Sequence, residues 1–489
     1  MKKTLLTILS LTVIASAFAQ NDAQKKLENR VQKLEKEEVQ LDNTTKNHEA
    51  RLQKIEKKLR AVPYGFVRNY FNYDSRNTYT VIGGEYNMIP YDEKWNVTEQ
   101  FAEENGVERV DQNAVPSAHL LAITTRLGFN IEGPDVLGAK TTGKMEADFG
   151  GFSTTNSVLR IRHAYIKMNW EDTAKNLNQE LLVGQTWHPL SGDIMPEVLG
   201  MAAGAPFRAH SRTPQVRYIM YHGNIGITAA ALSQLQYMYN GPSFSNGAWS
   251  STNSTSFAYN AVMPELFLGV QFKNKNIYTQ LGSTMQPIRP RNFDYFDVKD
   301  DAGNVLKTNV ARPVSEMMFS FTPTFYFQYT KDLCAVKFRT MLASNTSHVN
   351  QLNGYGVTDV AADGTWSYAP IKATISYLNF AYGKKYRANL FLGYMKNLGA
   401  GQDLYNFGTD AAAKYLVFMK GGNNFTGLNS VYRIAPSISY NLPHFNLGLE
   451  YEWTACTYGQ QAADGSILDN ESLHQVVNNR ICLLVKYNF

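Results

Sequence analysis

The last ten residues of the chain form a predicted β-strand, Arg480-Ile481-Cys482-Leu483-Leu484-Val485-Lys486-Tyr487-Asn488-Phe489. Apolar residues occupy every second position from Ile481 to Phe489, so a strand places all five of them on one face. In a soluble sheet, an apolar edge strand that ends on an aromatic residue would template aggregation. In a closed barrel within a lipid bilayer, that edge pairs with the first strand and the apolar face contacts acyl chains. The ending therefore favours a transmembrane β-barrel.

The first residues indicate export from the cytoplasm. Lys2 and Lys3 precede an apolar run over residues 5–17, and the small residues around Ala19 are typical of a cleavage site. We predict a signal peptide over residues 1–19, because the apolar run is too short to span a membrane; the alternative is an N-terminal membrane anchor. No later stretch approaches about 20 unbroken apolar residues, so a membrane protein with this sequence would be a barrel.

Residues 20–62 form a separate predicted element, a short periplasmic coiled coil that ends at Pro63. Apolar residues recur there at heptad spacing, in two companion series flanked by charged side chains. The oligomerisation residues assigned to this seam are Leu27, Leu34, Leu41, Leu52, Ile55 and Leu59. Glu38, Thr45 and His48 are polar core positions that weaken its middle. Because a lone polar helix is marginal, we expect self-association, and the pattern is compatible with two strands or with three to four.

From Gly65 onward the sequence predicts an all-β barrel, which we assign to residues 63–489, with about sixteen antiparallel strands. Each candidate strand has close to the ~9–11 residues that a tilted membrane-spanning strand needs. The candidate strands cover residues 64–73, 118–132, 141–150, 157–169, 180–187, 214–222, 224–236, 259–272, 276–287, 317–330, 332–343, 370–383, 385–397, 430–441, 444–456 and 475–489.

The connections between these strands alternate in length. Even-numbered strands are followed by tight turns, such as those at residues 222–224 and 331–332. Odd-numbered strands are followed by long polar loops at residues 74–117, 188–213, 237–258, 288–316, 344–369, 398–429 and 457–474. Short turns on one rim and long loops on the other are typical of outer-membrane barrels. The alternation also assigns the coiled coil to the short-turn, periplasmic side.

Charge and motif content narrow the function. The chain carries a net charge of +5, but residues 63–489 are neutral, because the excess lies in the signal peptide and the coiled coil. An ion preference of the barrel must therefore come from where its charges lie. The three cysteines imply no disulfide framework. The chain contains no G-x-S-x-G, no H-E-x-x-H and no metal-type Cys/His spacing, so we expect no catalytic centre, no cofactor and no metal site.

Alternation within the strands separates a lipid face from a lumen face. Over residues 319–329, aromatic side chains alternate with Ser, Thr and Gln, which indicates water rather than a packed core inside. About sixteen strands leave an aqueous channel. Extending this alternation gives the pore-lining, anion-attracting residues Arg126, Arg160, Arg162, Arg217, Lys337, Arg339, Arg387, Arg433 and Arg480. The acids that share the inward phase are Glu132, Glu146, Asp148, Glu450 and Glu452. A basic lumen favours anions; the alternative is that these arginines only pair with the inward acids as scaffolding.

Three segments, at residues 159–165, 182–187 and 212–218, resemble the DcaP-like trimeric porins of Gram-negative outer membranes. The resemblance covers about sixty residues, together with the overall plan of a coiled coil followed by a barrel. It implies sixteen strands per subunit, a homotrimer, a periplasmic coiled coil and diffusion of small anionic solutes such as dicarboxylates. The ending on Phe489 similarly resembles the signal that the barrel-assembly machinery of outer membranes reads.

By the same resemblance, the loop at residues 188–213 is expected to fold into the barrel and narrow it. Its small residues from Gly200 to Ala205 permit a close approach to the wall. The constriction residues assigned to it are Asp193, Glu197, Arg208, His210 and Arg212. The alternative is an ordinary solvent loop, with Trp187 as an interfacial aromatic beside a satisfied His188. His163 follows the outward phase, and we expect it at a subunit contact.

These features predict an outer-membrane porin rather than an enzyme, through which small hydrophilic and mainly anionic solutes diffuse passively. The expected partners are outer-membrane lipids, lipopolysaccharide and the barrel-assembly machinery, without nucleic acid. One alternative is a glycan-binding or adhesive barrel, because the loops at residues 237–258 and 344–369 are rich in Asn, Ser, Gly, Tyr and Trp. A barrel hydrolase is another. The aspartates of residues 294–301 lack the regular spacing of a calcium loop.

Overall fold

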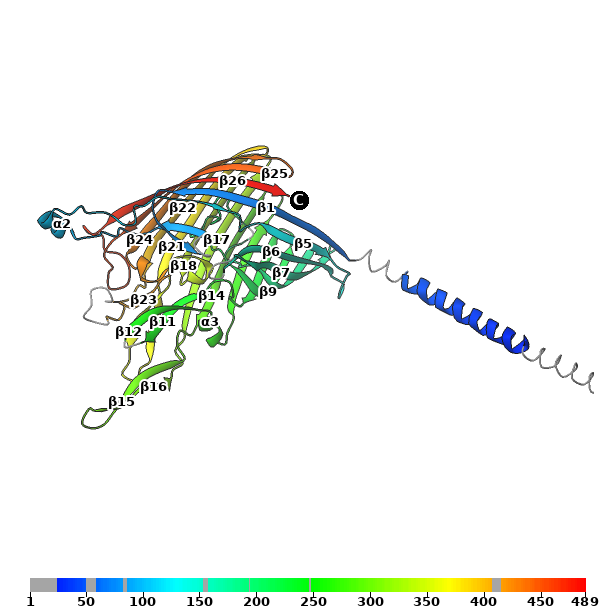
Figure 1. The fold of residues 1–489 in the computed structure, drawn as a ribbon, viewed down its shortest axis with the longest axis horizontal. Helices are drawn as coiled ribbons and strands as arrows, with labels where there is room; N and C mark the ends of the chain where they lie inside the picture. The colour runs from blue at the N-terminus through cyan, green and yellow to red at the C-terminus, as the bar shows by residue number, and fades with distance from the viewer. Residues whose placement is uncertain are drawn as a thin grey trace, which may run out of the picture. The chain divides into compact units, whose positions relative to one another are not determined.

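The computed structural model describes residues 24–49, 59–81, 86–152, 157–192, 194–245, 248–406 and 415–489, and it contains a closed antiparallel barrel of sixteen strands (Figure 1). The predicted fold class is confirmed, with one helix over residues 24–49 before the barrel. The barrel strands are β1 (Arg60–Asp74), β4 (Ser117–Leu121), β5 (Arg126–Glu132), β6 (Lys140–Phe152), β7 (Ser157–Asp172), β8 (Leu177–Trp187), β9 (Arg212–His222), β10 (Ile225–Leu232), β13 (Glu265–Lys273), β14 (Ile277–Ile288), β17 (Met318–Lys331), β18 (Cys334–Ser344), β21 (Lys372–Gly383), β22 (Tyr386–Gly399), β24 (Leu428–Asn441), β25 (Phe445–Tyr458) and β26 (His474–Asn488). Both β4 and β5 pair with β1, so together they occupy the second strand position.

The barrel closes where its first and last strands meet. β1 and β26 pair antiparallel from Phe66 opposite Asn488 to Asp74 opposite Arg480, and the two strands lie side by side in Figure 1. Gly65 and Phe489 extend this ladder by exchanging two backbone hydrogen bonds of 3.0 and 3.1 Å. The chain's last strand therefore has no free edge, which is the solution that its apolar pattern predicts.

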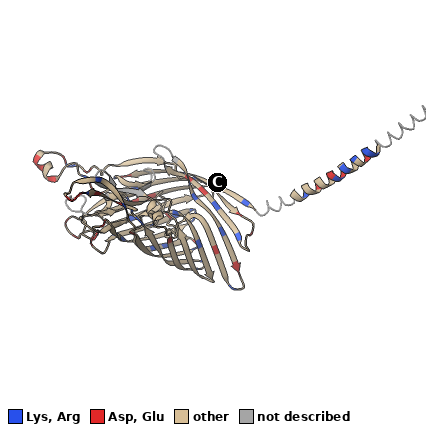
Figure 2. Ribbon diagram, turned by 90° about the horizontal axis from the view of Figure 1, so that it is seen from below, with Lys and Arg blue, Asp and Glu red and all other residues tan. Residues whose placement is uncertain are grey.

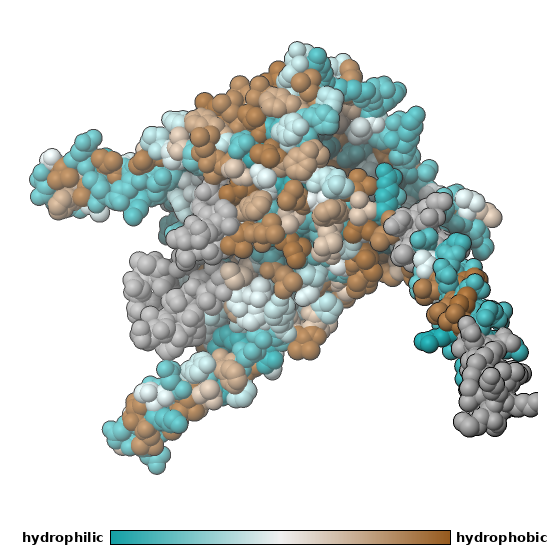
Figure 3. Space-filling view, turned by 45° about the vertical axis from the view of Figure 1, so that its right-hand side comes forward, coloured by the Kyte–Doolittle hydropathy of each residue, from teal (hydrophilic) through white to brown (hydrophobic). Residues whose placement is uncertain are grey.

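The alternation of side chains along the strands separates two environments. On β26, Ile481, Leu483 and Val485 are 40–44% exposed on the outer wall, whereas Arg480 is buried within the barrel. On β17, Phe319 and Phe321 are exposed on the outer wall, whereas Ser320, Thr322 and Thr324 are buried. Figure 3 shows apolar side chains gathered over the barrel wall, and Figure 2 shows charged residues distributed along its strands. The outer wall is therefore apolar and the interior polar, as the sequence predicts.

The long connections carry secondary structure of their own. They contain β2 (Thr78–Val81), β3 (Tyr86–Pro90), α2 (Glu99–Asn105), β11 (Tyr239–Ser245), β12 (Ala248–Ser254), α3 (Ser256–Asn260), β15 (Phe293–Lys299), β16 (Val305–Pro313), η1 (Ser347–Val349), β19 (Tyr355–Val360), β20 (Trp366–Pro370), β23 (Val417–Phe418) and η2 (Gly422–Phe425). The pairs β2–β3, β11–β12 and β15–β16 form hairpins, and β19, β20 and β23 form a three-stranded sheet. The long loops are thus built elements rather than unstructured links.

Two of the predicted strands extend too far into a neighbouring connection. The predicted strand at residues 259–272 begins only at Glu265, because Ser256–Asn260 is helical, Val262 has a φ of 58° and Pro264 has no N–H to donate to the ladder. The predicted strand at residues 224–236 ends at Leu232, where the chain turns into the next loop. Neither change alters the order of the barrel strands.

The N-terminal helix, residues 24–49, is exposed along its whole length. Leu27, Leu34 and Leu41 are 65%, 58% and 70% exposed, so their apolar surface is not covered within one chain. Leu52 and Ile55 lie outside the described residues, and Leu59 is 53% exposed just before β1. Residues 60–62, which we assigned to the coiled coil, are extended and belong to β1. Among the described residues, every helix is too short or too polar to cross a membrane.

Candidate functional site: the narrowed interior of the barrel

The connection between β8 and β9 lies inside the barrel. We call residues 188–211 the inward loop. Leu190, Ala205 and Phe207 are each at most 1% exposed, although they belong to a connection rather than to a strand. Phe207 packs against Phe391 of β22, with ring centroids 6.0 Å apart. The inward loop is therefore packed against the inner wall, where it narrows the interior.

Glycine makes this approach sterically feasible. A Cβ atom on Gly393 of β22 would lie 2.5 Å from the Phe207 ring, closer than a side chain can pack. Within the loop, Gly204 has a φ of +83°, and a Cβ atom there would lie 2.9 Å from Pro196. The small-residue run that the sequence shows between Gly200 and Ala205 is thus where the loop backbone meets the wall.

Polar groups of the wall hold the backbone of the inward loop. Glu450 of β25 accepts hydrogen bonds from the N–H groups of Leu199 and Gly200, at 2.7 and 2.8 Å. Asn379 of β21 accepts the N–H of Glu197 at 2.8 Å. Because this segment does not pair with a β-strand, these side chains provide hydrogen bonds to backbone N–H groups that would otherwise be buried without a partner.

A cavity of about 310 Å³ lies between the inward loop and the wall formed by β1, β5, β6 and β7, and we call it the basic cavity. Its lining includes six basic side chains but a single carboxylate. The basic residues are Arg68, Arg126, Lys144, Arg160, Arg162 and Arg208, and the acid is Glu146. Such an excess of one sign, in a space with low-dielectric walls, raises the local concentration of the opposite ion.

Three of the predicted pore-lining arginines meet two acids at this wall. Arg160 binds Asp148 at 3.0 Å, and Arg162 binds both Glu146 at 2.7 Å and Asp148 at 2.8 Å. Arg126 lies 3.4 Å from Glu146. These three arginines therefore do form pairs with the inward acids, as in the alternative to an anion-attracting lumen. Two carboxylates, however, cannot neutralise three guanidinium groups.

Trp187 is the aromatic centre of this region. The guanidinium carbons of Arg208 and Arg212 lie 4.5 and 4.6 Å from its ring centroid, a cation–π arrangement. Arg212 is fully buried, and its two Nη atoms have no hydrogen-bond partner among the described residues. Burial, together with the charges of Arg208 and Arg212, holds the pKa of His210 well below its ordinary value, so this imidazole is neutral. The positive charge beside the Trp187 ring therefore comes from Arg208 and Arg212 and not from His210.

Two other predicted pore-lining residues, Lys337 and Arg387, pair with a carboxylate of the inward loop. Glu197 lies 3.1 Å from Lys337 and accepts a 2.8 Å hydrogen bond from Arg387. Lys337 also donates to the carbonyl of Met195 at 2.8 Å. Burial raises the pKa of Glu197, but the hydrogen bond from Arg387 and the charge of Lys337 outweigh it, so the pKa lies below its ordinary value. Lys337 and Arg387 act as anchors for the inward loop.

Arg433 and Arg480 are likewise engaged by protein groups. Arg433 donates to the carbonyl of Ala205 at 2.8 Å and lies 3.3 Å from Glu452. Arg480 donates to Asp74 at 2.9 Å. Both side chains point into the barrel interior and stabilise it, rather than lining the basic cavity.

Arg339 and Arg217 complete the predicted set. Arg339 is fully buried, with its guanidinium carbon 4.9 Å from the centroid of the Tyr326 ring and no carboxylate partner among the described residues. Arg217 is half-buried on β9. Asp193, the remaining predicted constriction residue, lies outside the described residues.

The prediction that His163 faces outward is wrong. The β6–β7 register shifts between Glu146 and Ala147, so that Arg162 and His163 are both buried on the inner side while Ile161 is 62% exposed outside. His163 contacts Thr186 at 3.0 Å and lines the basic cavity. A β-bulge breaks the period of two, and strict alternation cannot detect it.

The alternative interpretation of Trp187 as an aromatic residue at the membrane interface, beside His188, does not agree with the structure. Trp187 lines the basic cavity, and His188 is fully buried beside Glu265. Sequence reasoning missed Arg68 and Lys144 as lining residues. Both follow the inward phase of their strands, because the neighbouring Val67 and Met145 are exposed, so alternation is the signal that indicates them.

A closed sixteen-stranded barrel with a charged interior and an inward-folded loop is the architecture of outer-membrane channels. The outer membrane channel DcaP of Acinetobacter baumannii is similar in structure, with a TM-score of 0.56 and 18% identity over 88% of this chain and 98% of that chain. Salmonella typhi OmpF in complex with daunomycin matches with a TM-score of 0.45 and 10% identity, over 88% of this chain and 97% of that chain. No protein-family model and no curated protein sequence matches the chain. The resemblance to DcaP-like channels is thus confirmed at the level of the fold.

Proposed function

We propose that the protein is an outer-membrane porin through which small hydrophilic solutes diffuse passively, with a preference for anions. The observation that carries this proposal is the basic cavity, where six basic side chains face one carboxylate beside the inward loop. A solute that passes the narrowed interior must pass this wall. Because residues 63–489 are neutral as a whole, an anion preference would arise from this local excess of positive charge.

The chemistry of the cavity supports small carboxylates as solutes. Guanidinium groups bind carboxylates bidentately, and Arg160 already binds Asp148 in this way, through Nε and Nη2 at 3.0 Å each. An entering anion competes with Asp148 and Glu146 for the same donors, so binding is weak enough for release. Dicarboxylates, with two acceptor groups, can contact two arginines at once.

We infer that the channel is a homotrimer in the outer membrane, with its coiled coil in the periplasm. The uncovered leucines at Leu27, Leu34 and Leu41 support self-association through the helix. The short connections, such as the turn between β9 and β10, lie on the rim opposite to the long loops, and the chain enters β1 from the short-turn side. In outer-membrane barrels that rim faces the periplasm. Phe489, whose backbone closes the barrel onto Gly65, is the proposed assembly signal.

Planar-bilayer recording of the purified mature protein tests this function. We expect stepwise conductance and, in a KCl gradient, a reversal potential displaced toward the chloride equilibrium potential. A reversal potential displaced toward potassium would refute the anion preference but not the channel. Absence of conductance, with glycan binding or lipid hydrolysis instead, would refute the porin assignment.

A further inference from the structure

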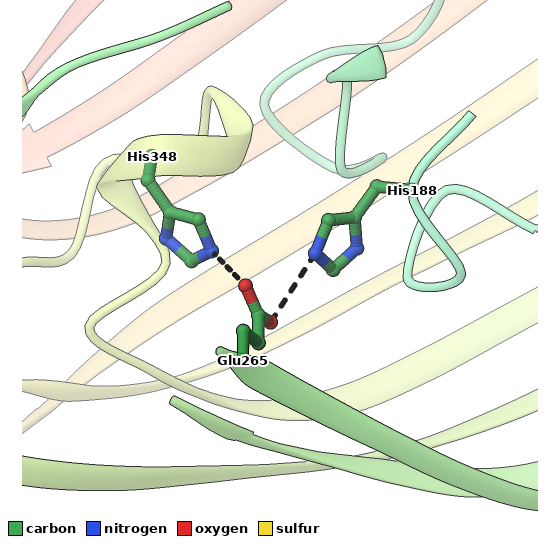
Figure 4. Close-up of side chains that lie close together, drawn as sticks. All are labelled: His188, Glu265 and His348. Carbon is green, nitrogen blue, oxygen red and sulfur yellow. Dashed lines mark hydrogen bonds and ion pairs between the residues drawn. The ribbon is translucent and has the colours of Figure 1, made fainter. Parts of the chain in front are cut away.

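Three titratable side chains from separate parts of the chain meet outside the basic cavity (Figure 4). His188 directly follows β8, Glu265 opens β13, and His348 lies in η1. Nε2 of His188 is 3.2 Å from Oε1 of Glu265, and Nε2 of His348 is 3.2 Å from Oε2 of the same carboxylate. All three side chains are buried, and their potential ligand atoms lie within 4.8 Å of one another.

We propose that His188, Glu265 and His348 bind one divalent transition-metal ion per subunit, with Zn²⁺ as the best match. Two imidazoles and one carboxylate are a ligand set that zinc takes with a fourth position left for water. Metal–ligand bonds of about 2.0–2.2 Å in a tetrahedron place neighbouring ligand atoms about 3.3 Å apart. The two nitrogen–oxygen distances of 3.2 Å are close to that value. Mg²⁺ and Ca²⁺ require more oxygen ligands than these residues supply.

The electrostatics of the cluster favour a cation. Among the described residues, Glu265 forms ion pairs with these two histidines only, without a lysine or arginine. His188 Nε2 and Glu265 Oε1 face each other, yet neither makes a hydrogen bond within the described part of the chain. Buried polar atoms of this kind are costly when left unsatisfied. A bound cation would coordinate both atoms and neutralise the carboxylate.

The surroundings provide access and orientation. A cavity of about 210 Å³, lined by Glu265, Gln286 and Tyr239 among others, reaches the carboxylate and has room for a water ligand. The amide nitrogen of Gln286 lies 2.8 Å from Nδ1 of His348, while its oxygen accepts hydrogen bonds from Ser320 and Asn345. A metal at Nε2 of His348 requires this amide to turn its oxygen toward the ring, where it would accept the Nδ1 proton, as is usual around metal-bound histidine.

His188 requires one rearrangement. The Leu190 N–H donates to Nδ1 of His188 at 3.1 Å, which places the proton of the neutral ring on Nε2. When a metal binds Nε2, that proton moves to Nδ1 and the hydrogen bond from Leu190 is lost. A single backbone hydrogen bond is a small loss beside two or three coordinate bonds. The bound metal would then join the start of the inward loop to β13 and η1.

Metal titration of the untagged mature trimer in detergent, after treatment with EDTA, tests the site. We expect one Zn²⁺ per subunit by calorimetry, and visible absorption typical of tetrahedral Co²⁺ when Co²⁺ is used as the probe. Substitutions E265Q and H348Q should each weaken Zn²⁺ affinity at least about tenfold. H474Q is the matched control, because His474 forms a 2.6 Å pair with Asp92 but lies outside the cluster.

Heat-modifiable mobility on gels establishes that each variant has folded, and H188Q replaces any variant that has not. Wild-type protein that binds no Zn²⁺ would overturn the proposal without any variant. Equal binding by wild-type, E265Q and H348Q proteins would also overturn it. Because conductance is measured separately, loss of the metal proposal leaves the channel proposal standing.

Discussion

The carboxylate of Glu450 on β25 accepts the backbone N–H of Gly200 in the inward loop at 2.8 Å. The neighbouring N–H of Leu199 donates to the same carboxylate at 2.7 Å. One side chain of the wall therefore fixes the part of the loop that contains most of its small residues. Glu450 is thus one of the wall groups that hold the inward loop, together with Asn379 and Arg387.

Replacing Glu450 by alanine should loosen the inward loop. Removal of a buried charged acceptor from two N–H donors costs about 1.5–3 kcal/mol, which permits the loop to leave the wall for part of the time. We expect larger and noisier single-channel currents in planar bilayers. E471A, at an exposed loop position, should behave as wild type. A quiet E450A channel with unchanged conductance would mean that the remaining anchors suffice.

Anion preference should depend on the arginines around the basic cavity. Substitutions R160S and R162S remove two of the six basic side chains of the cavity and leave Asp148 without its ion-pair partners, so the local excess of positive charge becomes smaller. Removing one such charge changes the energy of a passing ion by on the order of 1 kcal/mol, or about fivefold in the chloride-to-potassium permeability ratio. Reversal potentials in a KCl gradient measure this ratio. R312S, at a partly exposed pair with Asp294 in the β15–β16 hairpin, is the control, and equal shifts in both variants would contradict the assignment.

Acid should release the part of the inward loop that Glu197 anchors only at low pH. The pKa of Glu197 lies below its ordinary value of 4.5, so its pairs with Lys337 and Arg387 stabilise the folded loop at and above that pH. This stabilisation is lost as the pH falls through the lowered pKa. We expect the part of the conductance that depends on Glu197 to stay constant down to about pH 5 and to change below about pH 4. The E197Q channel should lack this acid transition; if it keeps the transition, another group is responsible.

The N-terminal helix should hold the subunits together. L34D places a charge in the predicted seam, where Leu34 is 58% exposed in the single chain. Burial of an unpaired charge in a helical interface is unfavourable, so we expect trimers that dissociate at lower temperature or detergent concentration. Sedimentation in detergent measures the oligomer. Q32D, outside the seam of the same helix, should leave it unchanged, and an unaffected L34D trimer would show that the barrels associate without the helix.

Much of the fold could be predicted from two patterns. Side chains alternate with a period of two along the strands, and short connections alternate with long ones along the chain. The lipid face of β17 and the closure of β26 on β1 follow from the side-chain alternation. This alternation fails where the backbone departs from regular pairing. The helix α3, the early end of β10 and the register shift beside His163 are such places.

The candidate site was predictable only in part for a related reason. Alternation indicates which arginines point inward, but it cannot indicate which carboxylate each one meets across the interior. Arg387 meets Glu197 at a separation of 190 residues, and this contact exists only because the loop folds inward. The cluster of His188, Glu265 and His348 is drawn from two connections and the first residue of β13, with no common motif, so no spacing pattern in the sequence could have pointed to it.

The register shift in β7 has a consequence for how this wall can change over evolutionary time. One extra residue puts both Arg162 and His163 on the inner side. The inward-facing residues of β7 therefore have even numbers up to Arg162 and odd numbers from His163. Deleting either residue would remove the bulge and restore regular alternation, with all other residues of β7 on the faces that they now occupy. At this point of the barrel, gain or loss of a single codon would therefore add or remove one inward side chain without displacing the rest of the strand.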